Sequence, residues 1–306
     1  MSIGAIFPGQ GAQSVGMLAD LAQSFPVVQD KFSEASDVLG FDLWRMVQDG
    51  PAEDLSATQN TQPILLTASA AVWSVWQQQA ELPALVAGHS LGEYSALACA
   101  GAIPFAEAVA LVRLRGELME KAVPRGQGAM AAVMGLENDQ VREICEETEG
   151  VVVAANFNAP GQVVIAGAAK AVELASENCK SAGAKRAVML DVSGPFHSPL
   201  MAAAKDEFAQ ALNKVNLNMP QVPVVQNVDA KIAVDLEQLK SNLLAQISAP
   251  VLWSDCVLTM VSSGVDRFVE CGPGKVLAGL TRRISKTTPT QSLATPDGIA
   301  AALVQD

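Results

Sequence analysis

The pattern of apolar and polar positions predicts alternating strands and helices over roughly the first 125 residues. Short apolar runs at 3–7 ("IGAIF") and 84–88 ("ALVAG") predict strands buried on both faces. Longer apolar-rich segments predict helices at 65–79, directly after residue 90, and from Pro104 to about Val123. Strands and helices in alternation are typical of an α/β domain with a parallel sheet.

The pattern changes after residue 125. Strands are predicted at 128–135, 151–157, 161–167 and 184–192, with helices at 137–150 and 168–183. This βαββαβ order is that of the ferredoxin-like arrangement. Further strands at 222–229 and 266–271 extend the first sheet, and residues 287–306 show only weak patterning. We therefore expect a small ferredoxin-like domain, residues 126–193, inserted into a large domain formed by residues 1–125 and 194–306.

Composition and charge limit the classes of function. The chain has 306 residues, half of them apolar, and a net charge of −12, which argues against a nucleic-acid-binding protein. No signal peptide or membrane span is expected. Two histidines and no clustered ligands predict no metal site. The five cysteines lack a CxxC pair, so we expect reduced thiols in a cytoplasmic protein: Cys99, Cys145, Cys179, Cys256 and Cys271.

Residues 88–92 ("GHSLG") fit the pattern G-x-S-x-G at a predicted junction of strand and helix. A serine at such a sharp turn adopts strained backbone angles, and glycines on either side avoid clashes. The turn would expose the Ser90 hydroxyl and leave the N–H of Leu91 at a helix N-terminus, where an oxyanion is stabilised. Ser90 is therefore a candidate nucleophile; the alternative is a serine that only caps the helix.

A nucleophilic serine needs a base, and the chain offers two histidines. His89 adjoins Ser90 at the sharp turn, where we expect it to point elsewhere. His197 lies in a Gly-Pro loop ("GPFHSP") just after the last predicted strand of the small domain. We take His197 as the candidate base, against the alternative of a structural loop histidine. Asp191 is nearby in sequence, but the sequence does not identify the group that orients the base.

One arginine falls on the apolar face of the helix that follows Pro104. At 100° per residue, Arg115 lies in the middle of that face, whereas Arg113, Glu117 and Glu120 lie opposite. A guanidinium keeps its charge when buried, so Arg115 needs an anionic partner. That partner is either an Asp or Glu of the core or the carboxylate of a substrate. The apolar face comprises Ala108, Leu111, Val112, Leu118, Met119 and Ala122.

Nine segments, in order along the chain, resemble the malonyl-CoA:acyl carrier protein transacylases of bacterial fatty-acid synthesis. They include "FPGQGAQSVGM" (7–17), "TQPILLTAS" (61–69), "GHSLGEYSAL" (88–97), "GPFHSPLM" (194–201) and "GPGKVLAGL" (272–280). The other four are at 113–119, 128–136, 156–167 and 249–253. The resemblance extends to about residue 285 and implies a hydrolase-like α/β domain with a ferredoxin-like insert.

The resemblance implies catalytic roles for three positions. Ser90 would carry the malonyl ester. His197 would deprotonate Ser90 and then protonate the departing thiolate of CoA. Arg115 would hold the malonyl carboxylate.

Four further positions receive supporting roles from the same resemblance. The backbone N–H groups of Gln10 and Leu91 would form the oxyanion hole. The backbone carbonyl of Gln246 would orient the histidine in place of a triad acid. Phe196 precedes the histidine. In related synthase domains, a Phe at this position goes with selectivity for malonyl groups, and a Ser goes with selectivity for methylmalonyl groups.

The implied reaction transfers malonyl from malonyl-CoA to the phosphopantetheine thiol of acyl carrier protein, with no cofactor. We expect a monomer that meets its carrier transiently. An acidic carrier would dock on one of two basic clusters, which the sequence does not rank. One comprises Lys275, Arg282, Arg283 and Lys286, and the other Lys180, Lys185 and Arg186.

Two other interpretations share these features. A serine hydrolase such as a thioesterase would carry the same turn, and a carrier-binding subunit could contain an inert site. The sequence leaves open the cognate carrier, the tolerance for other acyl groups, and whether the pathway makes fatty acids or polyketides.

Overall fold

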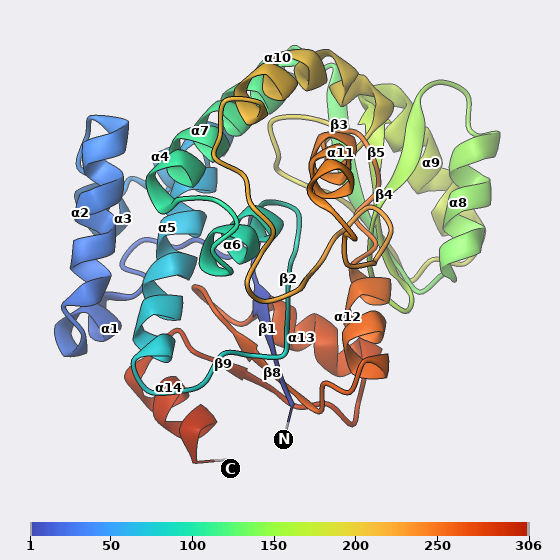
Figure 1. Cartoon of the computed structure of the whole chain (residues 1–306). Coiled ribbons are helices and arrows are strands. Elements are labelled where there is room, and N and C mark those ends of the chain that lie inside the picture. Colours follow the sequence, from blue (N-terminus) through green and yellow to red (C-terminus); the bar gives the residue numbers. More distant parts are fainter. Residues whose placement is uncertain (1, 305–306) are drawn as a thin grey trace.

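Two β-sheets organise residues 2–304, the part of the chain that the computed structural model describes (Figure 1). The larger sheet has five strands in the order β7-β2-β1-β8-β9, and every neighbouring pair is parallel. The α/β class with a parallel sheet, predicted from the apolar runs, is thus confirmed. The strands are β1 (Ile3–Phe7), β2 (Leu85–Gly88), β7 (Val224–Val225), β8 (Arg267–Glu270) and β9 (Thr290–Ser292).

Helices cover both faces of this sheet. Successive side chains of β1 point to opposite sides, and because both sets are apolar, both sides need to be buried. Phe7 packs on one side against Trp73 of α5. Ile6 joins a second buried cluster on the other side, with Val257 of α12 and Leu277 of α13. The helices are α1 (Ala19–Ser24), α2 (Val27–Leu39), α3 (Leu43–Asp49), α4 (Ala52–Ser56), α5 (Thr58–Gln77), α6 (Leu91–Cys99), α7 (Phe105–Lys121), the short 3-10 helix η1 (Pro199–Met201), α10 (Ala202–Leu212), α11 (Leu236–Gln246), α12 (Trp253–Ser262), α13 (Val276–Ile284) and α14 (Pro296–Leu303).

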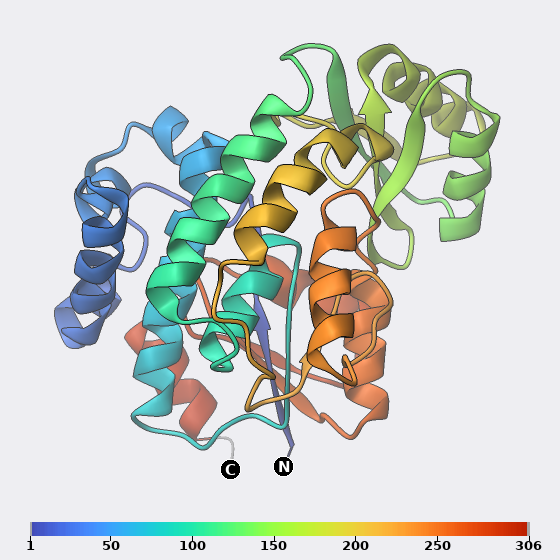
Figure 2. The ribbon, with the colours of Figure 1, turned by 45° about the horizontal axis from the view of Figure 1, so that its top comes forward.

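The second sheet has four antiparallel strands in the order β4-β5-β3-β6. Its strands are β3 (Gly128–Met134), β4 (Val152–Ala159), β5 (Gln162–Ala168) and β6 (Arg186–Met189). Helices α8 (Asn138–Glu147) and α9 (Ala169–Ser181) pack against it around a separate buried cluster. Figure 2 shows this unit in green and yellow-green beside the larger one.

Two predicted strands are shorter than their apolar runs. The run at 184–192 pairs with β3 only as far as Met189, and the residues that follow turn toward a cavity. The run at 222–229 forms only the two-residue β7, because Gln226 and Asn227 leave the ladder and donate hydrogen bonds to Glu93. After each strand ends, the chain contributes residues to the cavity or to the hydrogen bonds of Glu93.

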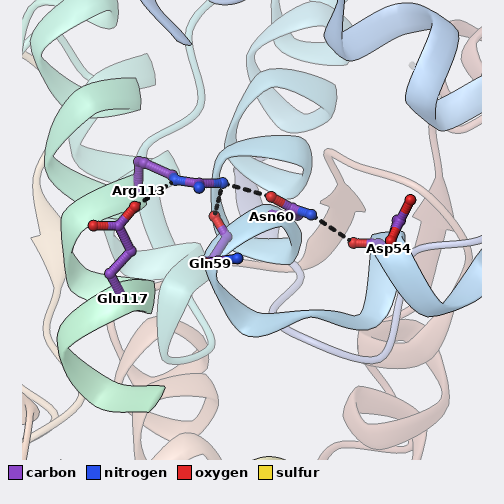
Figure 3. Close-up of polar contacts among 5 residues, drawn as sticks. All are labelled: Asp54, Gln59, Asn60, Arg113 and Glu117. Carbon is purple, nitrogen blue, oxygen red and sulfur yellow. Dashed lines mark hydrogen bonds and ion pairs between the residues drawn. The ribbon is translucent and has the colours of Figure 1, made fainter. Parts of the chain in front are cut away.

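Helix α5 begins at Thr58, seven residues before its apolar run, and contains Pro63. Proline has no N–H, so the carbonyl of Gln59 loses its partner within the helix. Arg113 of α7 donates to that carbonyl at 3.2 Å instead (Figure 3). A contact from another helix thus allows the proline to lie inside α5. Among residues 2–304, no helix is both long and apolar enough to cross a bilayer.

Candidate active site

Ser90 occupies the sharp turn between β2 and α6, with φ 52° and ψ −106°. A Cβ at Gly88 would lie 1.9 Å from the carbonyl of Gly92, and one at Gly92 would lie 2.0 Å from the carbonyl oxygen of Phe7. No larger residue fits at either position, because Gly88 packs on the start of α6 and Gly92 packs on the end of β1. Ser90 is the N-cap residue of α6, as the alternative interpretation expected, but its side chain makes no capping hydrogen bond to the helix. Its hydroxyl is free for another partner.

That partner is His197. The Ser90 hydroxyl donates to Nε2 of His197 across 2.6 Å, and Nδ1 of the same ring donates to the backbone carbonyl of Gln246 at 2.8 Å. Because a carbonyl oxygen only accepts, the ring proton lies on Nδ1, and Nε2 is left to accept from the hydroxyl. Gln246 ends α11, where carbonyls lack partners within the helix. The helix end therefore supplies the group that orients the histidine.

Burial, with a further contribution from the charge of Arg115, lowers the pKa of His197 to about 3. The ring is therefore neutral near pH 7 and able to accept a proton. Asp191 is exposed and makes no contact with this ring. His89 instead donates from Nε2 to the amide oxygen of Asn158 at 2.7 Å, and burial lowers its pKa. The prediction that His89 points elsewhere is confirmed.

Arg115 is only 1% exposed and approaches the same serine. Its Nη2 lies 3.3 Å from Ser90 Oγ, and the guanidinium stacks 5.0 Å from the Tyr94 ring centroid. Its other hydrogen bonds, each 2.9 Å long, go to the side-chain oxygens of Gln62 and Gln246. No carboxylate among the described residues forms an ion pair with it. Of the two alternatives, the salt bridge with an Asp or Glu of the core is therefore wrong, because the side-chain amides of Gln62 and Gln246 occupy that place.

The two arginines of α7 point to opposite sides, as the periodicity predicts. Arg113 forms an ion pair with Glu117 at 2.8 Å and also contacts Gln59 and Asn60 of α5 (Figure 3). Arg113 and Glu117 are partly exposed, and the Arg113 guanidinium has partners on both helices. Arg115 therefore differs from Arg113 in burial and in the absence of a carboxylate.

A cavity of about 200 Å³ lies between the carboxyl end of β2 and the second sheet. Of the residues predicted for the site, Gln10, Ser90, Leu91, Arg115, Phe196 and His197 line it. Gln246 does not line the cavity but contacts His197 and Arg115 from behind. The other lining residues are Gln62, His89, Met119, Met130, Asn156, Asn158, Val164, Leu190 and Val192. Both sheets thus contribute walls to one site.

The sequence analysis missed two supporting residues. Asn227 accepts from the N–H of Ser90 and donates to the carbonyl of Gly88, each at 2.8 Å, and so braces the turn. Glu93 accepts from the N–H of Asn227 and from the side chains of Gln226 and Gln246. Burial raises the pKa of Glu93 to about 7. Its position was detectable, since Glu93 is the only charged residue in the apolar helix α6.

The geometry suits covalent acyl chemistry. A serine hydroxyl bonded to a neutral histidine is an activated nucleophile. The N–H of Leu91 is the first of α6, where helix N–H groups have no partner within the helix. An unpaired guanidinium beside the hydroxyl favours an acyl group with an anionic end. The described residues contain no cluster of three His, Cys, Asp or Glu side chains placed to hold a metal ion.

Fold and site together define an acyltransferase, and the acyl transferase domain family matches residues 5–296. Within that class, the chain belongs to the malonyl CoA-acyl carrier protein transacylase family. It is 54% identical over 301 residues to the malonyl CoA-acyl carrier protein transacylase of Escherichia coli K12, with 97% of each chain covered.

Two solved structures support the same conclusion. An acyl carrier protein S-malonyltransferase from Vibrio cholerae is 52% identical, with a TM-score of 0.97 over 99% of this chain and 100% of that one. A malonyl-transacylase in complex with a type II PKS acyl-carrier protein is 50% identical, with a TM-score of 0.98 over all of both chains.

Proposed function

We propose that this protein transfers the malonyl group from malonyl-CoA to the phosphopantetheine thiol of an acyl carrier protein, through a malonyl ester on Ser90. The observation that carries the proposal is the buried guanidinium of Arg115, which lies 3.3 Å from Ser90 Oγ and forms no ion pair with a carboxylate of residues 2–304. The malonyl carboxylate is the partner that this cation lacks. The names of the relatives support the same substrates.

In the first half-reaction, Ser90 Oγ attacks the thioester carbonyl while its proton moves to Nε2 of His197. The N–H groups of Leu91 and Gln10 stabilise the oxyanion, which is worth about 10²–10³ in rate for one such donor. The C–S bond then breaks, and the CoA thiolate takes the proton from His197. In the second half, the carrier thiol gives its proton to His197 and attacks the ester. Ser90 leaves and recovers the proton.

Phe196 lines the cavity and is almost fully buried. In this position the ring would crowd an α-methyl branch on the acyl group, so we assign it to the selection of malonyl over methylmalonyl. The carbonyl of Gln246 replaces the acid of a triad by holding Nδ1 of His197.

We also assign the second sheet and its helices to a ferredoxin-like domain, residues 126–193, inserted between residues 1–125 and 194–306. The strand order β4-β5-β3-β6, with two helices against the sheet, supports this assignment. We propose a monomer that needs no cofactor and acts in the cytoplasm. The five free cysteines suit a reducing compartment.

Of the two basic clusters, we favour the one on α13 as the carrier-docking site. Lys275 follows Gly274, which approaches the carbonyl of Ala12 in the loop that carries Gln10. This approach puts Lys275 near the loop whose Gln10 lines the cavity, which supports the choice. Arg186 in the other cluster lies at the opposite end of β6 from Leu190, the cavity residue that follows this strand.

Intact mass measured after mixing the protein with malonyl-CoA tests the proposal. A stable adduct of one malonyl group is expected on the unsubstituted protein and none on Ser90→Ala. Adding a holo carrier protein should remove the adduct and produce malonyl-carrier. Release of free malonate without an acceptor would contradict the proposal and indicate a hydrolase.

A further inference from the structure

A buried chain of hydrogen bonds connects the catalytic groups to an acid behind them. Gln246 accepts from Arg115 through its side-chain oxygen at 2.9 Å and donates through its side-chain nitrogen to Glu93, also at 2.9 Å. The same nitrogen donates to the carbonyl of Ser90 at 3.0 Å. All three side chains are buried, with Gln246 and Glu93 showing no exposed surface. A single amide group therefore separates a buried cation from a buried acid.

The hydrogen bonds of Glu93 suit an ionised carboxylate, because every partner donates. Gln226, Gln246 and the N–H of Asn227 all donate to it, at 2.8 to 3.1 Å. None of its partners accepts, so no hydrogen bond favours a proton on this acid. At a pH above the Glu93 pKa of about 7, where the carboxyl is ionised, Glu93 and Arg115 therefore offset each other's charge without touching.

The amide spacer explains how Arg115 stays buried and yet remains available. A direct ion pair with Glu93 would satisfy the guanidinium and compete with any incoming carboxylate. With Gln246 between them, the acid offsets the charge from a distance, while Nη2 remains directed at Ser90 Oγ. The strength of attraction for a substrate carboxylate then depends on how much of the Arg115 charge the acid offsets.

We propose that Glu93 is a positioning residue that acts through the side-chain amide of Gln246 and sets how strongly the site prefers acyl groups with a terminal carboxylate. The inference rests on the proposed transfer of malonyl groups. This role of Glu93 is separate from the roles proposed for Ser90, His197 and Arg115.

Two substitutions should change the preference in opposite directions. Glu93→Gln removes the offsetting charge, so Arg115 attracts malonyl more strongly, whereas the uncharged acetyl group gains nothing. Gln246→Glu places a carboxylate directly on Arg115 and keeps the backbone carbonyl that orients His197. We therefore expect the ratio of kcat/KM for malonyl-CoA over acetyl-CoA to rise about five- to tenfold in Glu93→Gln and to fall at least as much in Gln246→Glu.

The ratio is the decisive measurement, because a merely structural role would lower both rates by one factor. Glu270→Gln is the matched control: Glu270 is also a buried acid, accepts from the N–H groups of Leu277 and Ala278, and makes no bond to the site. Its ratio should equal that of the unsubstituted protein.

A ratio that does not rise in Glu93→Gln, or that does not fall in Gln246→Glu, would overturn the inference while malonyl transfer itself remains. If Glu93→Gln does not fold, Gln246→Glu decides by the same ratio. The proposed function fails separately, if the unsubstituted protein forms no malonyl adduct on Ser90.

Discussion

At the scale of single residues, burial determines the chemistry of this site more than residue type does. Arg113 and Arg115 are two positions apart on one helix, yet one forms a partly exposed ion pair and the other is buried against amides. His197 differs from an ordinary histidine because burial and a nearby cation keep it neutral. At the surface, Arg115 could form a salt bridge as Arg113 does, and His197 would change its charge near its ordinary pKa of about 6.5.

Replacing Arg115 by alanine should separate malonyl from acetyl transfer. The variant would lose the proposed charge-assisted hydrogen bonds to the malonyl carboxylate, so kcat/KM for malonyl-CoA should fall about 10²-fold or more relative to acetyl-CoA. Arg113→Ala, on the opposite face of α7, should leave the ratio of the two unchanged. Steady-state kinetics with both substrates checks this, and equal losses for both substrates in Arg115→Ala would contradict the carboxylate role.

The pH dependence should show a base that stays active in mild acid. The pKa of His197 is lowered to about 3, so the ring loses its function only as the pH falls through that low value, not near 6.5. We expect kcat/KM for malonyl-CoA not to fall between about pH 7.5 and about pH 5.5, since this parameter reports the free enzyme. A descending limb centred near pH 6.5 would refute this. Asp191→Asn should leave the profile unaltered.

At the scale of elements, the turn between β2 and α6 is the most constrained part of the site. Gly88 lies against the start of α6 and Gly92 against β1, and Asn227 beside β7 bonds to the backbone of Gly88 and Ser90. The ends of three parallel strands thus hold the positive φ of Ser90, a conformation that costs about 1–3 kcal/mol where the surroundings do not impose it.

Glycine-to-alanine substitutions should show how tightly this turn is packed. Gly92→Ala places a Cβ 2.0 Å from the carbonyl oxygen of Phe7, so we expect a loss of about 3 kcal/mol or more in the free energy of unfolding. Gly279→Ala in α13 meets no atom within 4 Å and should gain up to about 1 kcal/mol through helix propensity. Urea unfolding of both variants measures the difference. Similar unfolding midpoints for the two variants would show that the turn can move to accommodate the added Cβ.

At the scale of the whole molecule, the site exists only because both sheets contribute residues to one cavity. Met130, Asn156, Asn158 and Val164 of the second sheet line the same cavity as Ser90. Asn158 also bonds to His89, which joins the units at the turn itself. A large second substrate must therefore approach at the junction of the two units.

Charge reversal should identify the surface that receives the carrier. Lys275→Glu should lower kcat/KM for the carrier protein about tenfold at low salt and less at high salt, because exposed charges are screened. The rate of serine malonylation by malonyl-CoA should not change. Arg186→Glu is the control for the other cluster and should have the smaller effect; the reverse order would place docking on the second sheet.

The sequence by itself determined the local features of this protein. Apolar runs defined the core strands β1, β2 and β8, and helical periodicity separated Arg115 from Arg113, because both patterns depend only on near neighbours. The flanking glycines identified the turn at Ser90 for the same reason.

Only the tertiary structure decided which groups meet. The partners of Arg115 come from 53 and 131 positions away in the chain, and His197 reaches Ser90 across 107. The end of β7 and the proline within α5 likewise depend on side chains from other elements, because Glu93 and Arg113 bond to backbone groups there. Burial by distant segments, which no local pattern encodes, gives His197 its low pKa, and distant amides rather than a carboxylate of residues 2–304 contact Arg115.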